Sequence, residues 1–217
     1  MSAGSYHVKI PKDLGTRLRV LDRLSRVPQT LGEYGDLLHE YTEKCLKEPR
    51  VKAHFQEIYE GERIFGHVDY ETRHKVQLSS GRQVYVACAL DALVEGFFQP
   101  IEIDSSCFHC GQQIQISLGK GATHSVKPSS TVLWLGASKE GVGSCETYLC
   151  PYINFFSSSE HVAEWRDKNR KELGMMLTLQ QSLELARKGY WEVIRLLRTA
   201  RAKSYPPKPK TLLKNYS

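Results

Sequence analysis

The residues that decide the fold are numbers 83–98, which read QVYVACALDALVEGFF. The first five carry β-forming side chains and predict a strand over 83–87. From Cys88 onward the apolar residues recur at helical spacing, at positions Leu90, Leu93, Val94 and Phe97. The stretch therefore predicts a strand that leads directly into a helix over 88–98, with Cys88 at the junction.

Short runs of β-forming residues lie on both sides of this stretch. They predict further strands at 64–67, 75–78, 100–103, 113–118, 131–135 and 152–156. The segment 79–82, Ser-Ser-Gly-Arg, has the composition of a hairpin connection. Because few helices separate these strands, we expect most of them to pair antiparallel.

Helical patterns occupy both ends of the chain. Residues 12–60 predict two or three short helices, one of them capped by Thr30 with Glu33 three residues later. Near the other end, Ser158 or Ser159 is expected to cap a helix through Lys171, and Thr178 a helix over 179–199. The predicted class is α+β: a mostly antiparallel β-sheet core flanked by helices, with a helical N-terminal subdomain and C-terminal helices. The boundaries are 1–62 for the helical subdomain, 63–203 for the core and 204–217 for a basic, Pro-rich tail.

The composition excludes several classes of protein. Of the 217 residues, 41% are hydrophobic and 25% charged, which is typical of a globular chain. No apolar run approaches the roughly 20 residues that span a bilayer, and residues 1–15 lack the apolar region of a secretory signal. We therefore expect a cytoplasmic protein without a membrane partner. The net charge of +6 gathers largely near the C-terminus, so nucleic acid is not an expected partner either.

Cysteines are concentrated in the middle of the chain. The six are Cys45, Cys88, Cys107, Cys110, Cys145 and Cys150. Without a secretory signal, and in a chain too large to need disulfides, they are interpreted as thiols for metal binding or catalysis.

Cys88, Asp91 and Cys150 form the most suggestive set. A cysteine at a helix N-terminus is expected to favour its thiolate, and Asp91 lies three residues later on the same face. Pro151 places Cys150 at a strand end or edge. Two thiolates brought together across a sheet would select copper(I), zinc or heavier thiophilic ions. From these residues alone, a packing role for Cys88 and a helix-stabilising role for Asp91 stay open.

The region from about Ile64 to Trp165 resembles the catalytic core of the bacterial alkylmercury (organomercurial) lyases. The matching features, in the same order and spacing, are Phe65–Gly66, the hairpin, Tyr85, Cys88 to Asp91 with its apolar helix, Ser105 to Cys107, Cys150 with Phe155–Phe156, and Glu164–Trp165. The resemblance implies that 63–203 is a catalytic core, with Cys88 and Cys150 as the metal-binding thiols and Asp91 as the proton donor. It also implies a structural role for Cys107.

The activity that this resemblance implies is protonolysis of carbon–mercury bonds, in mercury detoxification. A thiolate captures the soft alkylmercury cation, a second thiolate raises the electron density at the bonded carbon, and a carboxylic acid protonates that carbon. No organic cofactor is required, and mercury(II) would remain as bound product until small thiols or a dithiol partner protein remove it. Ala87 and Pro151 depart from the residues expected beside the two cysteines, which leaves the identity of the organomercurial or other small-molecule substrate open.

Cys107-Phe108-His109-Cys110-Gly111 allows a different assignment. A C-x-x-C pair followed by glycine resembles half of a zinc-ribbon knuckle. Cys145 and Cys150 could supply the other half, which would make Cys150 a structural zinc ligand. Cys107 and Cys110 could instead form a redox pair, a mercury relay or another second thiol site, and His109 could ligate.

Two alternatives change the function as a whole. The lyase-like fold could act on a different organic substrate, with Cys88 as nucleophile, or could bind zinc or a soft metal without catalysis. A metal-sensing DNA-binding regulator would require a basic face on the N-terminal helices, and acidic residues there dilute the charge.

Overall fold

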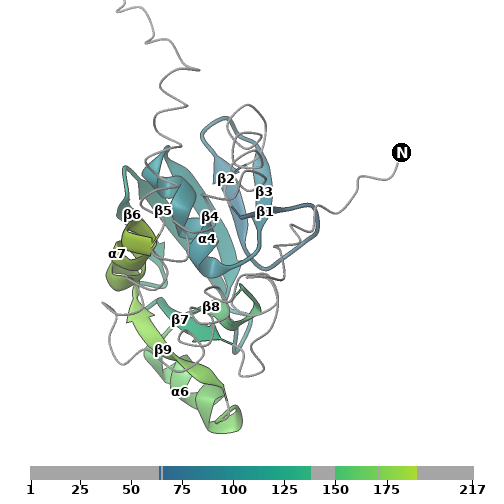
Figure 1. Ribbon diagram of the computed structural model, residues 1–217, viewed down its shortest axis with the longest axis vertical. Coiled ribbons are helices and arrows are strands. Elements are labelled where there is room, and N and C mark those ends of the chain that lie inside the picture. Colours follow the sequence, from purple (N-terminus) through teal and green to yellow (C-terminus); the bar gives the residue numbers. More distant parts are fainter. Residues whose placement is uncertain (1–63, 65, 138–149, 171, 190–217) are drawn as a thin grey trace, which may run out of the picture.

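The computed structural model describes residues 64, 66–137, 150–170 and 172–189. Their strands form two antiparallel sheets, and Figure 1 shows the smaller sheet below the larger one. The six-stranded sheet has the order β1-β3-β2-β4-β5-β6 and the three-stranded sheet the order β8-β7-β9. The bounds are β1 His67–Val68, β2 Lys75–Leu78, β3 Gln83–Val86, β4 Ile101–Ser106, β5 Gln113–Gly119, β6 Ala122–Lys127, β7 Val132–Ala137, β8 Ile153–Phe156 and β9 Leu173–Thr178.

Helices connect and cover these strands. They are α4 (Ala89–Val94), α6 (Ser159–Lys168) and α7 (Leu179–Gly189), with the 3-10 turns η1 (Glu95–Phe97) and η2 (Cys150–Tyr152). None of the helices in the described part of the chain is long and apolar enough to span a bilayer.

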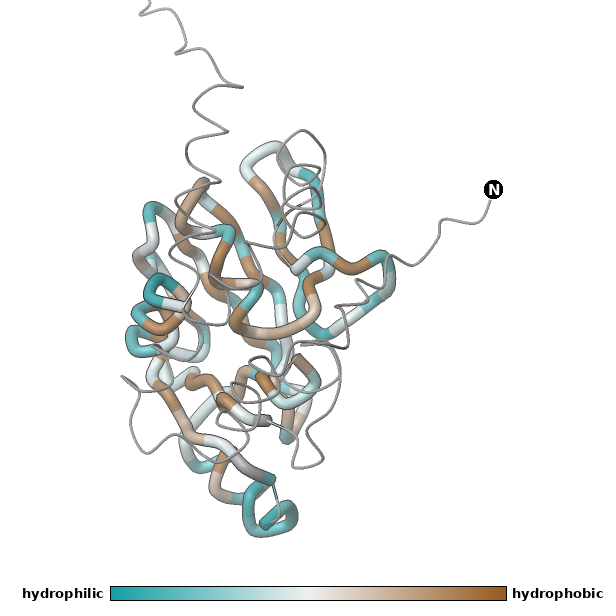
Figure 2. Tube along the Cα trace, in the orientation of Figure 1, coloured by the Kyte–Doolittle hydropathy of each residue, from teal (hydrophilic) through white to brown (hydrophobic). Residues whose placement is uncertain are grey.

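The larger sheet buries one face. Along β2, β4 and β5 buried and more exposed residues alternate, as expected for strands with one face against a core. The antiparallel register places Val76 opposite Ile103 and Ile103 opposite Ile116, so these side chains form a continuous apolar row. Figure 2 shows the same alternation of hydrophobic and hydrophilic residues along the strands.

The short helix α4 lies at the centre of the molecule. All six of its residues are buried, and it contacts α7, β8 and β3. A helix buried on every side is normally apolar throughout, yet α4 includes Asp91, a carboxyl group with only 5% of its surface exposed. This exception marks the place in the fold where chemistry is expected.

The two later helices begin where the sequence predicts. Ser158 caps α6 by accepting a hydrogen bond from the backbone N–H of His161 at 3.3 Å. Thr178 and Gln181 form a reciprocal capping box at the start of α7, with bonds of 3.2 and 2.9 Å. These local bonds satisfy backbone donors that a helix start otherwise leaves without partners.

The predicted fold class is confirmed, and every strand pair in the described residues is antiparallel. The hairpin is confirmed as well, with Gly81 at φ +86° and its N–H donating to Leu78. Several bounds were wrong: β1 starts at His67, β4 continues to Ser106, β7 continues to Ala137, and α6 ends at Lys168 and not at Lys171. The predicted helix over 88–98 divides into α4 and η1. The strands β6 and β9 were not predicted. The subdomain 1–62, the tail 204–217 and the helix beyond Gly189 lie outside the described residues, so the domain boundaries stay predictions.

A buried histidine should make the stability of this fold depend on pH. Burial lowers the pKa of His74 from 6.5 to about 3, and the charge of Arg73 acts in the same direction. Between these two pH values the histidine is protonated in the unfolded chain and neutral in the folded protein. Stability should therefore fall as the pH drops through this window, by up to about 1.4 kcal/mol per pH unit.

Urea unfolding at a series of pH values tests this, with His74→Gln as the comparison because glutamine can still bond Ser105, whose Oγ lies 3.0 Å from the ring Nδ1. The variant should lose less stability than the parent between pH 6.5 and 4. Equal losses in the two proteins would contradict the assignment.

Candidate active site

Cys88 caps α4 at the point where β3 ends. Its backbone is extended, with φ −151° and ψ 170°, and its Sγ accepts a hydrogen bond from the backbone N–H of Asp91 at 3.4 Å. The N–H of the preceding Ala87 donates to the carbonyl of Gly66 at 2.8 Å, and this bond attaches the strand-to-helix junction to the segment at Gly66. The predicted place of Cys88 is thus confirmed.

Asp91 is packed directly against Gly66. A Cβ added at Gly66 would lie 2.4 Å from the Cβ of Asp91 and 2.8 Å from its Oδ2, both too close for any side chain. Gly66 also has φ +70°, a conformation that favours glycine. Glycine is therefore required twice at this position, for its backbone and for the space that the carboxyl group occupies.

Cys150 reaches the same carboxyl group from the turn that leads into the smaller sheet. It starts η2, just before the edge strand β8, and is half-buried. Its Sγ lies 3.9 Å from Asp91 Oδ2, within the range of an S–H···O hydrogen bond. One ligand atom from each of Cys88, Asp91 and Cys150 can be chosen so that all three lie within 4.8 Å of one another. The structure brings together all three residues that the sequence singled out.

The electrostatics of Cys88 differ from expectation. Burial raises the pKa of its thiol, a hydrogen bond with Cys150 opposes this, and the negative charge of Asp91 raises the pKa again. The prediction that the helix N-terminus favours a Cys88 thiolate was therefore wrong, because desolvation in the core outweighs the few N–H groups of a six-residue helix. A thiol with a raised pKa is protonated before it binds a metal ion, and it loses its proton when the metal–sulfur bond forms.

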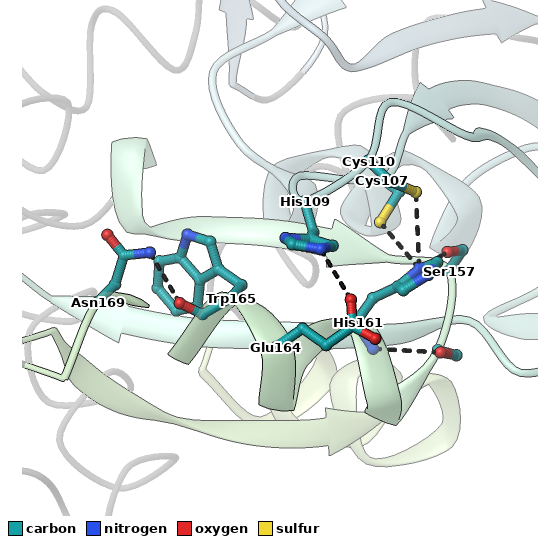
Figure 3. Close-up of polar contacts among 9 residues, drawn as sticks. Cys107, His109, Cys110, Ser157, His161, Glu164, Trp165 and Asn169 are labelled. Atoms are coloured by element: carbon teal, nitrogen blue, oxygen red, sulfur yellow. Dashed lines mark hydrogen bonds and ion pairs between the residues drawn. The ribbon is translucent and has the colours of Figure 1, made fainter. Parts of the chain in front are cut away.

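Cys107 and Cys110 lie in a separate cluster, drawn in Figure 3. Their sulfur atoms lie 3.7 and 3.6 Å from Nδ1 of His161, in the first turn of α6. Burial raises the pKa of Cys107, but hydrogen bonds from Ser157 and from backbone N–H groups outweigh it and lower the pKa to about 6. No disulfide joins the cysteines of the described residues.

This second cluster corrects one alternative. Cys150 groups with Cys88 and Asp91 and not with Cys107 and Cys110, so it does not complete a zinc ribbon. Cys145 lies outside the described residues. His161 was not predicted as a site residue, since it is separated from Cys110 by 51 positions and no spacing rule links the two.

Comparison with known proteins identifies the family of the chain. The family model MerB, alkylmercury lyase, matches residues 69–190. The chain belongs to the alkylmercury lyase family. It is 29% identical over 109 residues to alkylmercury lyases of Bacillus cereus and Clostridium butyricum. Each alignment covers 49% of this chain and 49% of the relative, so the chain spans about half the length of the curated relatives it matches.

A solved structure of this family shares the fold. The mercury-bound form of MerB2 superposes with a TM-score of 0.52 at 18% identity, covering 82% of this chain and 98% of that one. At this identity the likeness supports the architecture only. Cys88, Asp91 and Cys150 lie within the matched region 69–190 of the alkylmercury lyase family.

The contact between Gly66 and Asp91 can be tested by substitution. Gly66→Ala should destabilise the protein through two effects, the positive φ, at about 1–2 kcal/mol, and the collision with Asp91. Gly81→Ala is the matched control, because Gly81 also has positive φ but nothing lies within 4 Å of an added Cβ. Urea unfolding should show a loss at least about 1 kcal/mol larger for Gly66→Ala. Equal losses would show that the carboxyl group does not need this space.

Proposed function

We propose that this protein cleaves carbon–mercury bonds of organomercurials by protonolysis, with Cys88 and Cys150 as thiol ligands of the substrate and Asp91 as the proton donor. The observation that carries the proposal is the cluster itself: two thiols and one buried carboxyl group with ligand atoms within 4.8 Å. Membership of the alkylmercury lyase family supports the same chemistry.

The proposed chemistry needs each of the three groups. Mercury in an alkylmercury cation is soft and binds thiolate sulfur in preference to water or carboxylate. A second sulfur ligand pushes electron density toward mercury and onto the carbon bonded to it. That carbon then becomes basic enough to take a proton from a nearby acid, which Asp91 supplies.

The protons balance without any further reactant. Each thiol loses its proton as its sulfur binds mercury. Asp91 can accept one of these two protons, because Sγ of Cys150 lies 3.9 Å from its Oδ2 and Cys88 interacts with the same carboxyl group. Protonated Asp91 transfers this proton to the carbon as the carbon–mercury bond breaks, and the hydrocarbon leaves. The second thiol proton goes to solvent, and mercury(II) remains bound to both sulfurs.

Burial of the cluster favours the reaction in two ways. Cys88 and Asp91 are almost fully buried, so the proton moves in a medium of low dielectric constant where water does not compete. Cys150 is half-buried and gives the cluster its access to solvent. Mercury would therefore enter and leave on the Cys150 side, and small thiols or a dithiol partner protein would remove it there.

The proposed reaction also indicates a cellular compartment and role. The thiols must stay reduced to bind mercury, a condition met in the cytoplasm. We place the protein there, in mercury detoxification, with no organic cofactor.

Substitution separates capture of the substrate from its cleavage. The reduced parent protein, given phenylmercury and excess small thiol, should release benzene, measured by gas chromatography. Asp91→Asn should still bind phenylmercury but release benzene about 10²–10⁴-fold more slowly, the usual contribution of a general acid. Cys88→Ser and Cys150→Ser should lose both tight binding and release. Glu102→Gln, which removes an exposed carboxylate on β4, is the control and should match the parent.

Two results would overturn the proposal. Unchanged release by Asp91→Asn would remove this residue from the reaction. Absence of benzene from a folded, reduced parent that still binds phenylmercury would show that the cluster captures organomercurials without cleaving them. In that case a different organic substrate would have to be sought for the same three groups.

A further inference from the structure

The second cluster is built from two segments far apart in the chain. Cys107 follows β4 and Cys110 ends a tight turn, which is closed by the N–H of Gly111 donating to the carbonyl of Cys107 at 2.9 Å. Gly111 has φ +75°. The N–H of Phe108 donates to the carbonyl of Phe155 at 2.9 Å, so the turn is attached to β8. His161 approaches from the capped first turn of α6.

More polar groups meet at His161 Nδ1 than one ring nitrogen can satisfy. The Oγ of Ser157 lies 2.5 Å away, and the sulfur atoms of Cys107 and Cys110 lie 3.7 and 3.6 Å away. A ring nitrogen carries either one proton or one lone pair, so it forms one good hydrogen bond. Figure 3 shows both sulfur atoms directed at this nitrogen. Hydrogen bonding alone therefore does not explain the convergence.

The distances match those around a tetrahedral metal ion. With metal–sulfur and metal–nitrogen bonds of about 2.3 and 2.0–2.1 Å, a tetrahedral angle separates sulfur and nitrogen by about 3.6 Å, and a linear arrangement by about 4.4 Å. Both sulfur–nitrogen distances in the protein agree with the tetrahedral value. A metal ion can bind all three groups with little movement, and the hydroxyl of Ser157 is then available to donate to the thiolate of Cys107, a contact that already lowers its pKa.

The surroundings suit an ion with one open position. The ring of His109 packs beside that of His161, with centroids 5.5 Å apart, but its Nε2 lies 3.0 Å from Oε2 of Glu164 and is therefore bonded outside the cluster. Cys110 is exposed, so a water molecule can occupy the fourth position. Two sulfur atoms and one imidazole nitrogen in tetrahedral geometry are a typical donor set for zinc(II).

We propose that Cys107, Cys110 and His161 form a second metal site that binds zinc(II), with water as the fourth ligand. The site is separate from the Cys88–Asp91–Cys150 cluster, because Cys150 precedes β8 and Ser157 follows it. The bound ion links the turn after β4 to the start of α6. It thereby holds the end of β8 opposite to Cys150.

Metal titration of the full-length, reduced, metal-free protein tests the site. Zinc affinity is measured in competition with a chromophoric chelator, and cobalt(II) serves as the spectroscopic probe. The parent should bind one equivalent of zinc, and cobalt should give the absorption of a tetrahedral, thiolate-bound ion. Cys110→Ser and His161→Gln should each weaken zinc binding by at least about tenfold. Both residues lie outside the fully buried core, so these variants are expected to fold.

Two controls identify the location of the ion. His109→Gln removes the neighbouring imidazole and should leave zinc affinity unchanged, since His109 bonds Glu164. Cys88→Ser should also keep the zinc, although it loses the proposed lyase activity, so the two proposals fail independently. Absence of stoichiometric zinc binding in the folded parent would overturn the second site. Zinc binding that survives His161→Gln and disappears in Cys88→Ser would overturn it equally, by placing the ion in the lyase cluster.

Discussion

The structure depends on one constraint, the burial of a carboxyl group inside a helix that is otherwise apolar. Asp91 lies on α4, which both sheets and α7 enclose. A buried carboxyl group is costly without close polar partners. The fold supplies two of them: the thiol of Cys88, one turn before, which interacts with the carboxyl group, and the thiol of Cys150 in η2, whose Sγ lies 3.9 Å from Oδ2. Gly66, which has no side chain, leaves the space that the carboxyl group fills.

The edge strand β8 connects this constraint with the second thiol cluster. All four residues of β8 are buried, and the strand pairs with β7. Cys150 precedes it and Ser157 follows it, so both clusters depend on the same four residues for their placement. The proposed zinc site would thus act on the lyase cluster only through the position of this strand. The two sites have different groups: the lyase cluster has one carboxyl group and two thiols, and the proposed zinc site has one imidazole and two thiols.

The parts predicted from sequence are those that local patterns determine. Alternating apolar residues defined β2 to within a residue, and the change of period at Cys88 located the strand-to-helix junction. The strand β6 was missed because its side chains are mostly exposed and carry no alternation. Two properties could not be predicted from the sequence, because they arise only in the folded chain. They are the raised pKa of Cys88, which follows from burial, and the position of His161 beside Cys107 and Cys110, which no sequence spacing encodes. The resemblance to the lyases named Cys88, Asp91 and Cys150, and the fold shows only that they meet.

The most direct test of the proposed reaction follows one proton and one metal ion through a single turnover. The reduced protein is mixed with one equivalent of phenylmercury in heavy water, without added thiol. The account predicts benzene carrying one deuterium, since the proton comes from an exchangeable thiol through Asp91, together with mercury(II) bound to two sulfur atoms in the X-ray absorption spectrum. Phenylmercury that stays intact on one sulfur atom, with no benzene formed, would contradict it.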